Sequence, residues 1–495
     1  MNKQLLHVSV AALVLLAALI VSTTYWQTWA VGDLADRQDN AIQLVARLTV
    51  DRGKILGAGG TVLATNRKHR KHGLTTFTRR YPAGHLAPQV IGYSTAAGTT
   101  TGLEASLEDY LTGANTNLSN TFSQELDKLG GKTVHGDNVI LTLRPALQSL
   151  ALQELQGRCG AVVALDAKTG AVYAMASSPT YDPNLIEQPN GFAKVLRIKG
   201  SCGDSSALVN NATAGLYPPG STFKMVTAAA ALDSGAYTPS SVFDDPGYCV
   251  EYGSHVSNAG NPDQNGPEAF GSVTLEQGFE HSINSVFCNV GKHIGGEKIL
   301  EYAKRFGFYS LPPLDTPPST SQQSGLYKNG KLWFPKDSNQ IDPGRLAFGQ
   351  FNMLATPLQM ALVAATIADK GAEPKPYLVQ KIVASDGSTV ATTSPQTLGH
   401  PIKASTAAEL NRMMQLVVQA GTGTSAQIPG VAVAGKTGTA ELGLGTVYDA
   451  WFVCFAPANN PRFVVSVVVE KQPNGFGGSV SAPIAKAILE KLLGT

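Results

Sequence analysis

The sequence predicts a mixed α/β protein with one sheet flanked by helices, a smaller N-terminal α+β domain and a single transmembrane helix. An apolar run occupies residues 5–21, and residues 160–176 have the pattern of two strands joined by a turn at Lys168-Thr169-Gly170. Three further strand-like stretches lie near the C-terminus. Because strands at both ends enclose several helical patterns, we expect them to meet in one sheet.

Residues 1–29 are predicted to form a cytoplasmic N-terminus and a membrane anchor. The apolar run follows Lys3 and precedes three aromatic residues, Tyr25, Trp26 and Trp29. A membrane-spanning helix needs about 20 apolar residues, and Trp and Tyr favour the membrane–water boundary. A cleaved secretory signal is the alternative, but no clean A-x-A site follows the run. Lys3 would keep the N-terminus inside, so the rest of the chain is expected outside the cell membrane.

Composition narrows the class of protein. A chain of 495 residues is long enough for two or three domains, and with 43% hydrophobic and 15% charged residues it is not a disordered chain. The formal net charge of +2 disfavours a nucleic-acid binder. Five cysteines lack C-x-x-C spacing, which argues against zinc. Cys202–Cys249 is one candidate disulfide among several, and buried free thiols are equally compatible.

The remaining elements follow in chain order. Residues 30–155 are polar and rich in Gly and Thr, with a short apolar run at 139–143, and predict a membrane-proximal domain of short strands and loops. Residues 156–495 form the second predicted domain. Its helices are expected at residues 222–232, 275–290, 357–370, 404–419 and 482–493, and its late strands at 431–434 (running into Gly435), 450–455 and 463–470.

The stretch P-P-G-S-T-F-K ends with a serine three residues before a lysine. Because residues i and i+3 share a helix face, Ser221 and Lys224 can bring a hydroxyl and an amine together. Serine is a poor nucleophile unless a nearby base takes its proton. The prolines and Gly220 would hold Ser221 at the helix entrance. A serine N-cap followed by an ordinary lysine is the structural alternative, so other motifs must decide.

Two further motifs follow. Ser282-Ile283-Asn284 lies inside the helix predicted at 275–290; its hydroxyl could relay a proton and its amide could hold a substrate carbonyl. Alternatively, it is a polar helical turn. The Lys-Thr-Gly at 168–170 is best explained as a hairpin turn. The second copy, Lys436-Thr437-Gly438, continues a strand in which glycine permits close approach of a ligand or backbone.

In this order, S-T-F-K, S-I-N and K-T-G-T resemble the S-x-x-K, S-D-N and K-T-G motifs of penicillin-binding proteins and class A β-lactamases. Most of the chain is similar to class B penicillin-binding proteins, as in R-G-K-I-L-G-A-G-G-T-V-L-A, A-T-P-L-Q-M-A and G-K-T-G-T-A-E. The short membrane-proximal domain is similar to that of the A-type members from actinobacteria. Three departures stand out: Ile283 replaces the middle aspartate, Gly57-Ala58 replaces an Asp-Arg pair, and Arg144 replaces an aspartate.

The resemblance implies the penicillin-binding transpeptidase fold, with a five-stranded antiparallel sheet flanked by helices, and a serine D-Ala-D-Ala transpeptidase activity. Ser221 would be the nucleophile, Lys224 its base and Ser282 the proton relay. Asn284 would orient the donor peptide. Lys436, Thr437 and Thr439 would bind the terminal carboxylate of the donor peptide, and Gly438 belongs to the same substrate-binding motif. The backbone N–H groups of Ser221 and Thr439 would form the oxyanion hole.

The resemblance also implies partners. These are peptidoglycan stem peptides, β-lactams as covalent inhibitors, the membrane and a membrane glycan polymerase; no metal or cofactor is needed.

Other functions remain open. A β-lactamase shares two motifs, but Glu297-Lys298-Ile299-Leu300 is followed by Glu301 where a class A enzyme has asparagine. A D,D-carboxypeptidase differs mainly in using water as acceptor. A non-catalytic penicillin sensor would be free to lose the serine or lysine that this chain has.

Overall fold

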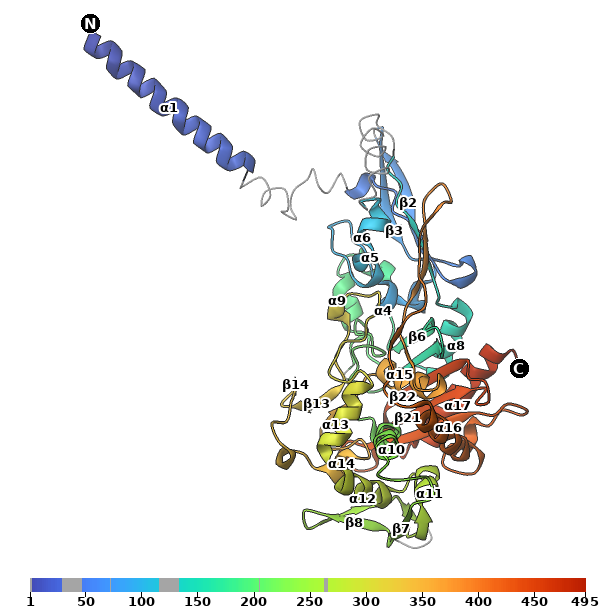
Figure 1. The fold of residues 1–495 in the computed structure, drawn as a ribbon. Coiled ribbons are helices and arrows are strands. Elements are labelled where there is room, and N and C mark those ends of the chain that lie inside the picture. Colours follow the sequence, from blue (N-terminus) through green and yellow to red (C-terminus); the bar gives the residue numbers. More distant parts are fainter. Residues whose placement is uncertain (1, 29–46, 72, 115–132, 204, 262–265) are drawn as a thin grey trace.

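The computed structural model describes residues 2–28, 47–71, 73–114, 133–203, 205–261 and 266–495 (Figure 1). Its first helix, α1 (Asn2–Thr28), contains a segment, Leu6–Tyr25, that is long and apolar enough to cross a membrane. None of this segment is buried in the described structure. The prediction of one apolar helix at this end of the chain is confirmed. Trp29, one of the three aromatic residues that follow the apolar run, lies outside the described residues.

One of the sheets is five-stranded and antiparallel, as predicted. Its spatial order is β20 (Ala434–Glu441), β21 (Val447–Ala456), β22 (Phe463–Pro473), β5 (Gly160–Asp166) and β6 (Val172–Ser178). The predicted hairpin at Lys168–Gly170 joins β5 and β6. The strand predicted at 431–434 is displaced: β20 begins only at Ala434. Strand β20 lies at the edge of the sheet, so one side of its backbone is available for other partners.

Helices cover both faces of this sheet. Because side chains alternate along a strand, Val163 belongs to one hydrophobic cluster and Val162 to another on the opposite face. Helices α8 (Pro145–Leu155) and α17 (Gly477–Leu493) pack on the Val162 face. The Val163 face is covered by α15 (Pro357–Ala368) and α16 (Ala404–Gln419), with α10 (Lys224–Asp233) against them. The four alanines of α10 are fully buried and permit this close packing.

One predicted helix is wrong. The stretch 275–290 forms two helices, α11 (Leu275–Glu280) and α12 (Asn284–Ile294), and Ser282 between them has a φ of 58°. The amide of Ile283 donates to Gly278 O at 2.8 Å, which ends α11, and the Ile283 side chain is buried. Apolar residues continue at helical spacing on both sides of this break, so periodicity alone could not reveal it.

Short elements surround these two helices at the end of the molecule drawn lowest in Figure 1. They are the 3-10 turn η4 (Gly220–Phe223), α13 (Gly296–Arg305), α14 (Pro343–Leu346), the pair β7 (Val242–Asp245) and β12 (Gly271–Thr274), and the hairpin of β8 (Tyr248–Glu251) and β9 (Ser254–Ser257). Each of them packs against α10, α11 or α12.

The N-terminal part has its own six-stranded sheet. Its order is β18 (Thr389–Thr392), β17 (Val379–Val383), β4 (Asn138–Leu141), β1 (Ile55–Leu56), β2 (Val62–Lys71) and β3 (Leu74–Arg80). The short strand expected at 139–143 is therefore present as β4. Two members, β17 and β18, come from the second half of the chain and were not predicted. The long hairpin of β2 and β3 was also not predicted.

Two of the three positions that depart from the family pattern, Gly57 and Arg144, make close contacts in the structure. A Cβ atom on Gly57 would lie 2.7 Å from the Cγ of Pro145, so the backbone here approaches the start of α8 closely. The Arg144 guanidinium lies over the Tyr173 ring at 3.8 Å from its centroid, a cation–π contact. Both residues thus serve packing between the N-terminal part and α8 or β6.

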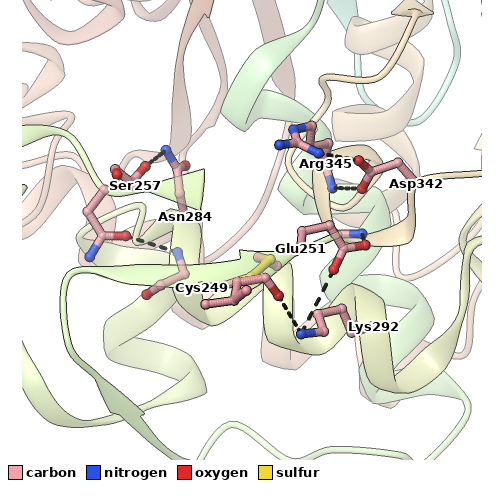
Figure 2. The surroundings of a disulfide bond; sticks show 12 residues. Cys249, Glu251, Ser257, Asn284, Lys292, Asp342 and Arg345 are labelled. Carbon is pink, nitrogen blue, oxygen red and sulfur yellow. Dashed lines mark hydrogen bonds and ion pairs between the residues drawn. A yellow bond between two sulfur atoms is a disulfide. The ribbon is translucent and has the colours of Figure 1, made fainter. Parts of the chain in front are cut away.

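The cysteine pairing differs from the candidate Cys202–Cys249. The disulfides join Cys159 to Cys202 and Cys249 to Cys288, while Cys454 is a buried free thiol. The second disulfide ties β8 to α12 (Figure 2). This pairing depends on Cα–Cα distances of 5.8 and 6.3 Å between residues about 40 positions apart, which only the folded chain creates.

Candidate active site

Ser221 lies in the 3-10 turn η4, one turn before α10 begins at Lys224. The expected helix at 222–232 therefore starts slightly later, although Ser221 and Lys224 remain i and i+3. Two hydrogen bonds hold the Pro-Pro-Gly segment before the serine. Trp451 Nε1 donates to Pro218 O at 2.9 Å, and Thr222 Oγ1 donates to Pro219 O at 2.6 Å. Gly220 has a φ of 49°, a conformation that glycine adopts at little cost.

The Lys224 amine is buried and points at the break between α11 and α12. Its Nζ donates to Ser282 O at 2.7 Å and to Asn284 Oδ1 at 2.8 Å, and Ser282 Oγ lies 3.3 Å away. Burial, assisted by the positive charge of Lys436, lowers the pKa of Lys224 well below its usual range. The lowered pKa favours the neutral amine, which is the form that can accept a proton.

Lys436 reaches the same serine from strand β20. Its Nζ donates to Ser282 Oγ at 2.8 Å and to Thr437 O at 3.1 Å. The side chain is fully buried, and this burial lowers the pKa of Lys436 to about 7. Lys436 is therefore partly charged at neutral pH, and its charge opposes protonation of Lys224.

The start of α12, at Asn284 and Ser285, is held by polar groups of neighbouring segments. Asn284 Nδ2 donates to Ser257 O at 3.1 Å, which links the start of α12 to β9 (Figure 2). Asn258 Oδ1 accepts from the backbone of Ser285, and the Ser285 hydroxyl donates to the buried Asp245. These contacts fix the end of α12 at which Asn284 faces Lys224.

Strand β20 forms one side of the site. The hydroxyls of Thr437 and Thr422 lie 2.6 Å apart, and Thr439 Oγ1 accepts from Gly477 N at 3.3 Å. A Cβ atom on Gly438 would lie 2.8 Å from Pro219 O and 2.9 Å from Thr222 Cγ2. Glycine at this position lets the edge strand lie directly against the serine turn.

These elements enclose a cleft of about 620 Å³. Five of the residues expected at the site line it: Ser221, Ser282, Asn284, Thr437 and Thr439. Lys224, Lys436 and Gly438 lie behind its surface, so all eight expected residues meet around one cleft. A second cleft of about 430 Å³ shares Ser221, Asn284 and Thr439 and is also lined by Arg345 and Gln350.

The sequence interpretation missed several residues of the cleft wall. They come from separate strands, helices and loops and carry no motif: Ser257, Asn258, His281, Thr422, Ser425, Tyr448, Phe476 and Ser479. The rings of Tyr448 and Phe476 stack at 5.7 Å between centroids and form an apolar rim. Only Thr422 could have been suspected, because G-T-G-T precedes the Lys-Thr-Gly strand, but this signal is weak.

Comparison with known proteins agrees with this geometry. Residues 160–490 match the model of the penicillin-binding protein transpeptidase domain, and residues 52–139 match the penicillin-binding protein A dimerisation domain. The peptidoglycan D,D-transpeptidase PbpA of Mycolicibacterium smegmatis is 34% identical over 509 aligned positions, covering 100% of this chain and 99% of the relative. PbpA of Mycobacterium tuberculosis is 32% identical with the same coverage.

Solved structures give the same result. The ceftriaxone acyl-enzyme complex of penicillin-binding protein A from M. tuberculosis superposes with a TM-score of 0.78 at 32% identity, covering 90% of this chain and 99% of that one. The D,D-transpeptidase domain of a peptidoglycan glycosyltransferase from Eggerthella lenta gives 0.75 at 35% identity, with the same coverage. The chain therefore belongs to the class B penicillin-binding proteins, with their transpeptidase fold.

Proposed function

We propose that this protein is a serine D,D-transpeptidase that cross-links peptidoglycan stem peptides and is acylated by β-lactams, with Ser221 as its nucleophile. One observation carries the residue assignment: two buried lysines from different elements, Lys224 and Lys436, meet at the hydroxyl of Ser282 beside the cleft that Ser221 lines. Buried lysines with lowered pKa values are expensive to maintain and concentrate at functional sites.

In the first half-reaction, the Ser221 oxygen attacks the peptide carbonyl of a D-Ala-D-Ala stem. A neutral amine has two N–H groups and one lone pair. In Lys224 the two N–H groups have carbonyl acceptors, Ser282 O and Asn284 Oδ1, which leaves the lone pair to accept the Ser221 proton. The backbone N–H groups of Ser221 and Thr439 stabilise the oxyanion.

Ser282 then relays the proton to the leaving D-alanine amine. Lys436 donates to the Ser282 oxygen, so the hydroxyl hydrogen is free to point toward Lys224 or the leaving nitrogen. Lys436, Thr437 and Thr439 bind the terminal carboxylate, and Asn284 orients the donor peptide. The C–N bond breaks, an ester to Ser221 remains, and the amine of a second stem peptide attacks this ester to form the cross-link.

The alternatives receive less support from the described residues. Glu297 lies in α13, which contributes nothing to either cleft, and Glu301 is paired with Lys298 and Arg305 at the surface. No glutamate at the class A position is therefore available to activate water for deacylation. A carboxypeptidase would have the same acylation site and differ only in the acceptor.

We further propose a membrane-anchored organisation. Residues 1–29 would hold the cytoplasmic N-terminus and anchor, residues 30–155 the membrane-proximal domain and residues 156–495 the transpeptidase domain outside the cell membrane. The apolar window Leu6–Tyr25 supports the anchor. A membrane glycan polymerase would supply the strands that are cross-linked.

Labelling with a fluorescent penicillin tests the residue assignment. Wild type and Ser240→Ala, which changes an exposed serine outside the cleft, should be labelled equally, whereas Ser221→Ala should not be labelled. Labelling of Ser221→Ala at the wild-type level would refute the nucleophile. Mass spectrometry of a stem-peptide reaction then distinguishes cross-linked product from trimmed peptide, and release of the penicillin label within seconds would favour a β-lactamase.

A further inference from the structure

The hairpin of β2 and β3 carries a dense positive charge at its exposed end. We call residues 67–80 the basic hairpin. It has six Lys and Arg residues, and residues 62–80 contain no Asp or Glu. Five of the six are exposed and make no ion pair within the described structure: Arg67, Lys68, Arg70, Lys71 and Arg80. The sixth, Arg79, is buried and paired with Glu104. The exposed charges therefore have no ion-pair partner in the part of the fold that is described.

These charges point to both sides of a narrow ribbon. The register pairs Arg67 with Thr78 and Lys68 with Phe77, so successive basic residues lie on opposite faces. Leu74, beside the turn, is 47% exposed. A protein partner that docks on one face would meet only part of this charge. A flat surface approached end-on meets the charges of both faces together with the apolar tip.

The position of the basic hairpin in the chain indicates which flat surface the hairpin would meet. The segment from the apolar helix re-enters the described structure at Arg47, and Arg47 lines a pocket together with Phe77 and Thr78 of the hairpin. Nineteen residue steps separate Thr28 from Arg47, which limits their separation to about 65 Å even for a fully extended chain. The cleft with Ser221 lies toward the opposite end of the molecule (Figure 1, near α10 and α12).

We propose that the basic hairpin rests on the membrane through its turn end, with Arg67, Lys68, Arg70 and Lys71 on the phosphates of anionic phospholipid headgroups and Leu74 among the headgroups. This inference depends on the membrane anchoring proposed above. The anchor keeps the hairpin at high effective concentration near the bilayer, and each basic residue close to an anionic surface adds attraction within a Debye length of about 8–10 Å. Contact at this end would orient the body and hold the cleft away from the bilayer.

The test uses the full chain reconstituted in nanodiscs of phosphatidylcholine, with or without phosphatidylglycerol. A donor fluorophore on Thr76→Cys reports energy transfer to acceptor-labelled headgroups; the native thiols do not compete, because four are in disulfides and Cys454 is buried. The charge variant changes Arg67, Lys68, Arg70 and Lys71 to Gln. The matched control changes Lys328 and Lys331 to Gln in another hairpin, that of β13 (Gly325–Lys328) and β14 (Lys331–Leu332).

Transfer should be high only in anionic discs, and both high salt and the charge variant should reduce it to the level of neutral discs. The control should match wild type. Equal transfer in neutral and anionic discs, or an unaffected charge variant, would overturn the proposal, as would transfer that requires an added acidic wall polymer. A chain that does not enter discs at all contradicts the anchor, and unchanged penicillin labelling of the charge variant separates this result from a failure of the active-site assignment.

Discussion

Lys224 and Lys436, 212 positions apart in the chain, lie on either side of the Ser282 hydroxyl, at 3.3 and 2.8 Å from its oxygen. One comes from the start of α10 and the other from the edge strand β20. Because both amines are buried and each is a potential cation, the protonation of one affects the other. This pair gives the site a pH dependence that can be measured.

Removing the charge of Lys436 should shift the pH dependence of acylation. In Lys436→Gln the pKa of Lys224 rises toward its usual value, although burial still keeps it below that value. Less neutral Lys224 is then present at neutral pH, so the ascending limb of the acylation rate should move to higher pH. Stopped-flow acylation by a penicillin measures this, with Lys328→Gln as an exposed-lysine control. A limb that stays in place or moves to lower pH would contradict the coupling.

Lys436 should also affect the pH dependence of stability. Its pKa is about 7 in the folded protein and near 10.5 when unfolded, so between these values the unfolded chain binds more protons. The free energy of unfolding therefore rises with pH across this window. Between about pH 7 and pH 9 the wild type should gain about 2 kcal/mol more than Lys436→Met. Denaturant unfolding at both pH values gives this difference; equal gains would show that Lys436 does not titrate as described.

A methyl group on Gly438 should slow acylation strongly. It would lie 2.8 Å from Pro219 O and 3.0 Å from Trp451 Cβ, which forces β20 away from the serine turn. Overpacking of this kind costs about 1–3 kcal/mol, whereas a shift of about 1 Å at a reacting group reduces the rate about 100-fold. Gly399→Ala is the matched control, because a Cβ there meets no atom within 4 Å. Penicillin acylation rates measure both variants, and a normal rate in Gly438→Ala would show that the close approach is unimportant.

The two disulfides should differ in their effect on activity. They close loops of similar length, with sequence separations of 43 and 39, so the loss of either should reduce stability by a similar amount, about 4 kcal/mol. Only Cys249–Cys288 joins β8 to α12, whose first residue Asn284 bonds Lys224 and Ser257. The double Ser variant of this pair should therefore acylate more slowly at a temperature where both variants are folded.

The double Ser variant of Cys159 and Cys202 serves as the control, because neither residue lines a cleft. Thermal unfolding establishes the stability of both variants, and penicillin labelling gives their rates. Equal rates in the two variants would mean that the β8–α12 link does not hold Asn284 in place.

Local patterns predicted much of the fold. Helix α16 ends where its apolar spacing ends, and the hairpin of β5 and β6 turns at Lys168–Gly170. In these elements the signal is within the segment itself: period, turn residues and strand-forming residues agree. By contrast, β17 and β18 extend a sheet whose other strands lie before residue 142, and nothing in their own residues indicates this partner. Strand pairing across such separations depends on which surfaces remain uncovered after the rest has folded.

The sequence by itself determined the three motifs and their order, because the chemistry of serine, lysine and glycine at fixed short spacing is a local property. It also determined the apolar N-terminal helix, most strands of the five-stranded sheet and most of the helices that cover it. Only the tertiary structure decided that the S-x-N motif sits in a break between helices, which cysteines pair, and which hydroxyl the two lysines share. These features depend on burial and on distances between segments tens to hundreds of residues apart, and those exist only when the chain is packed.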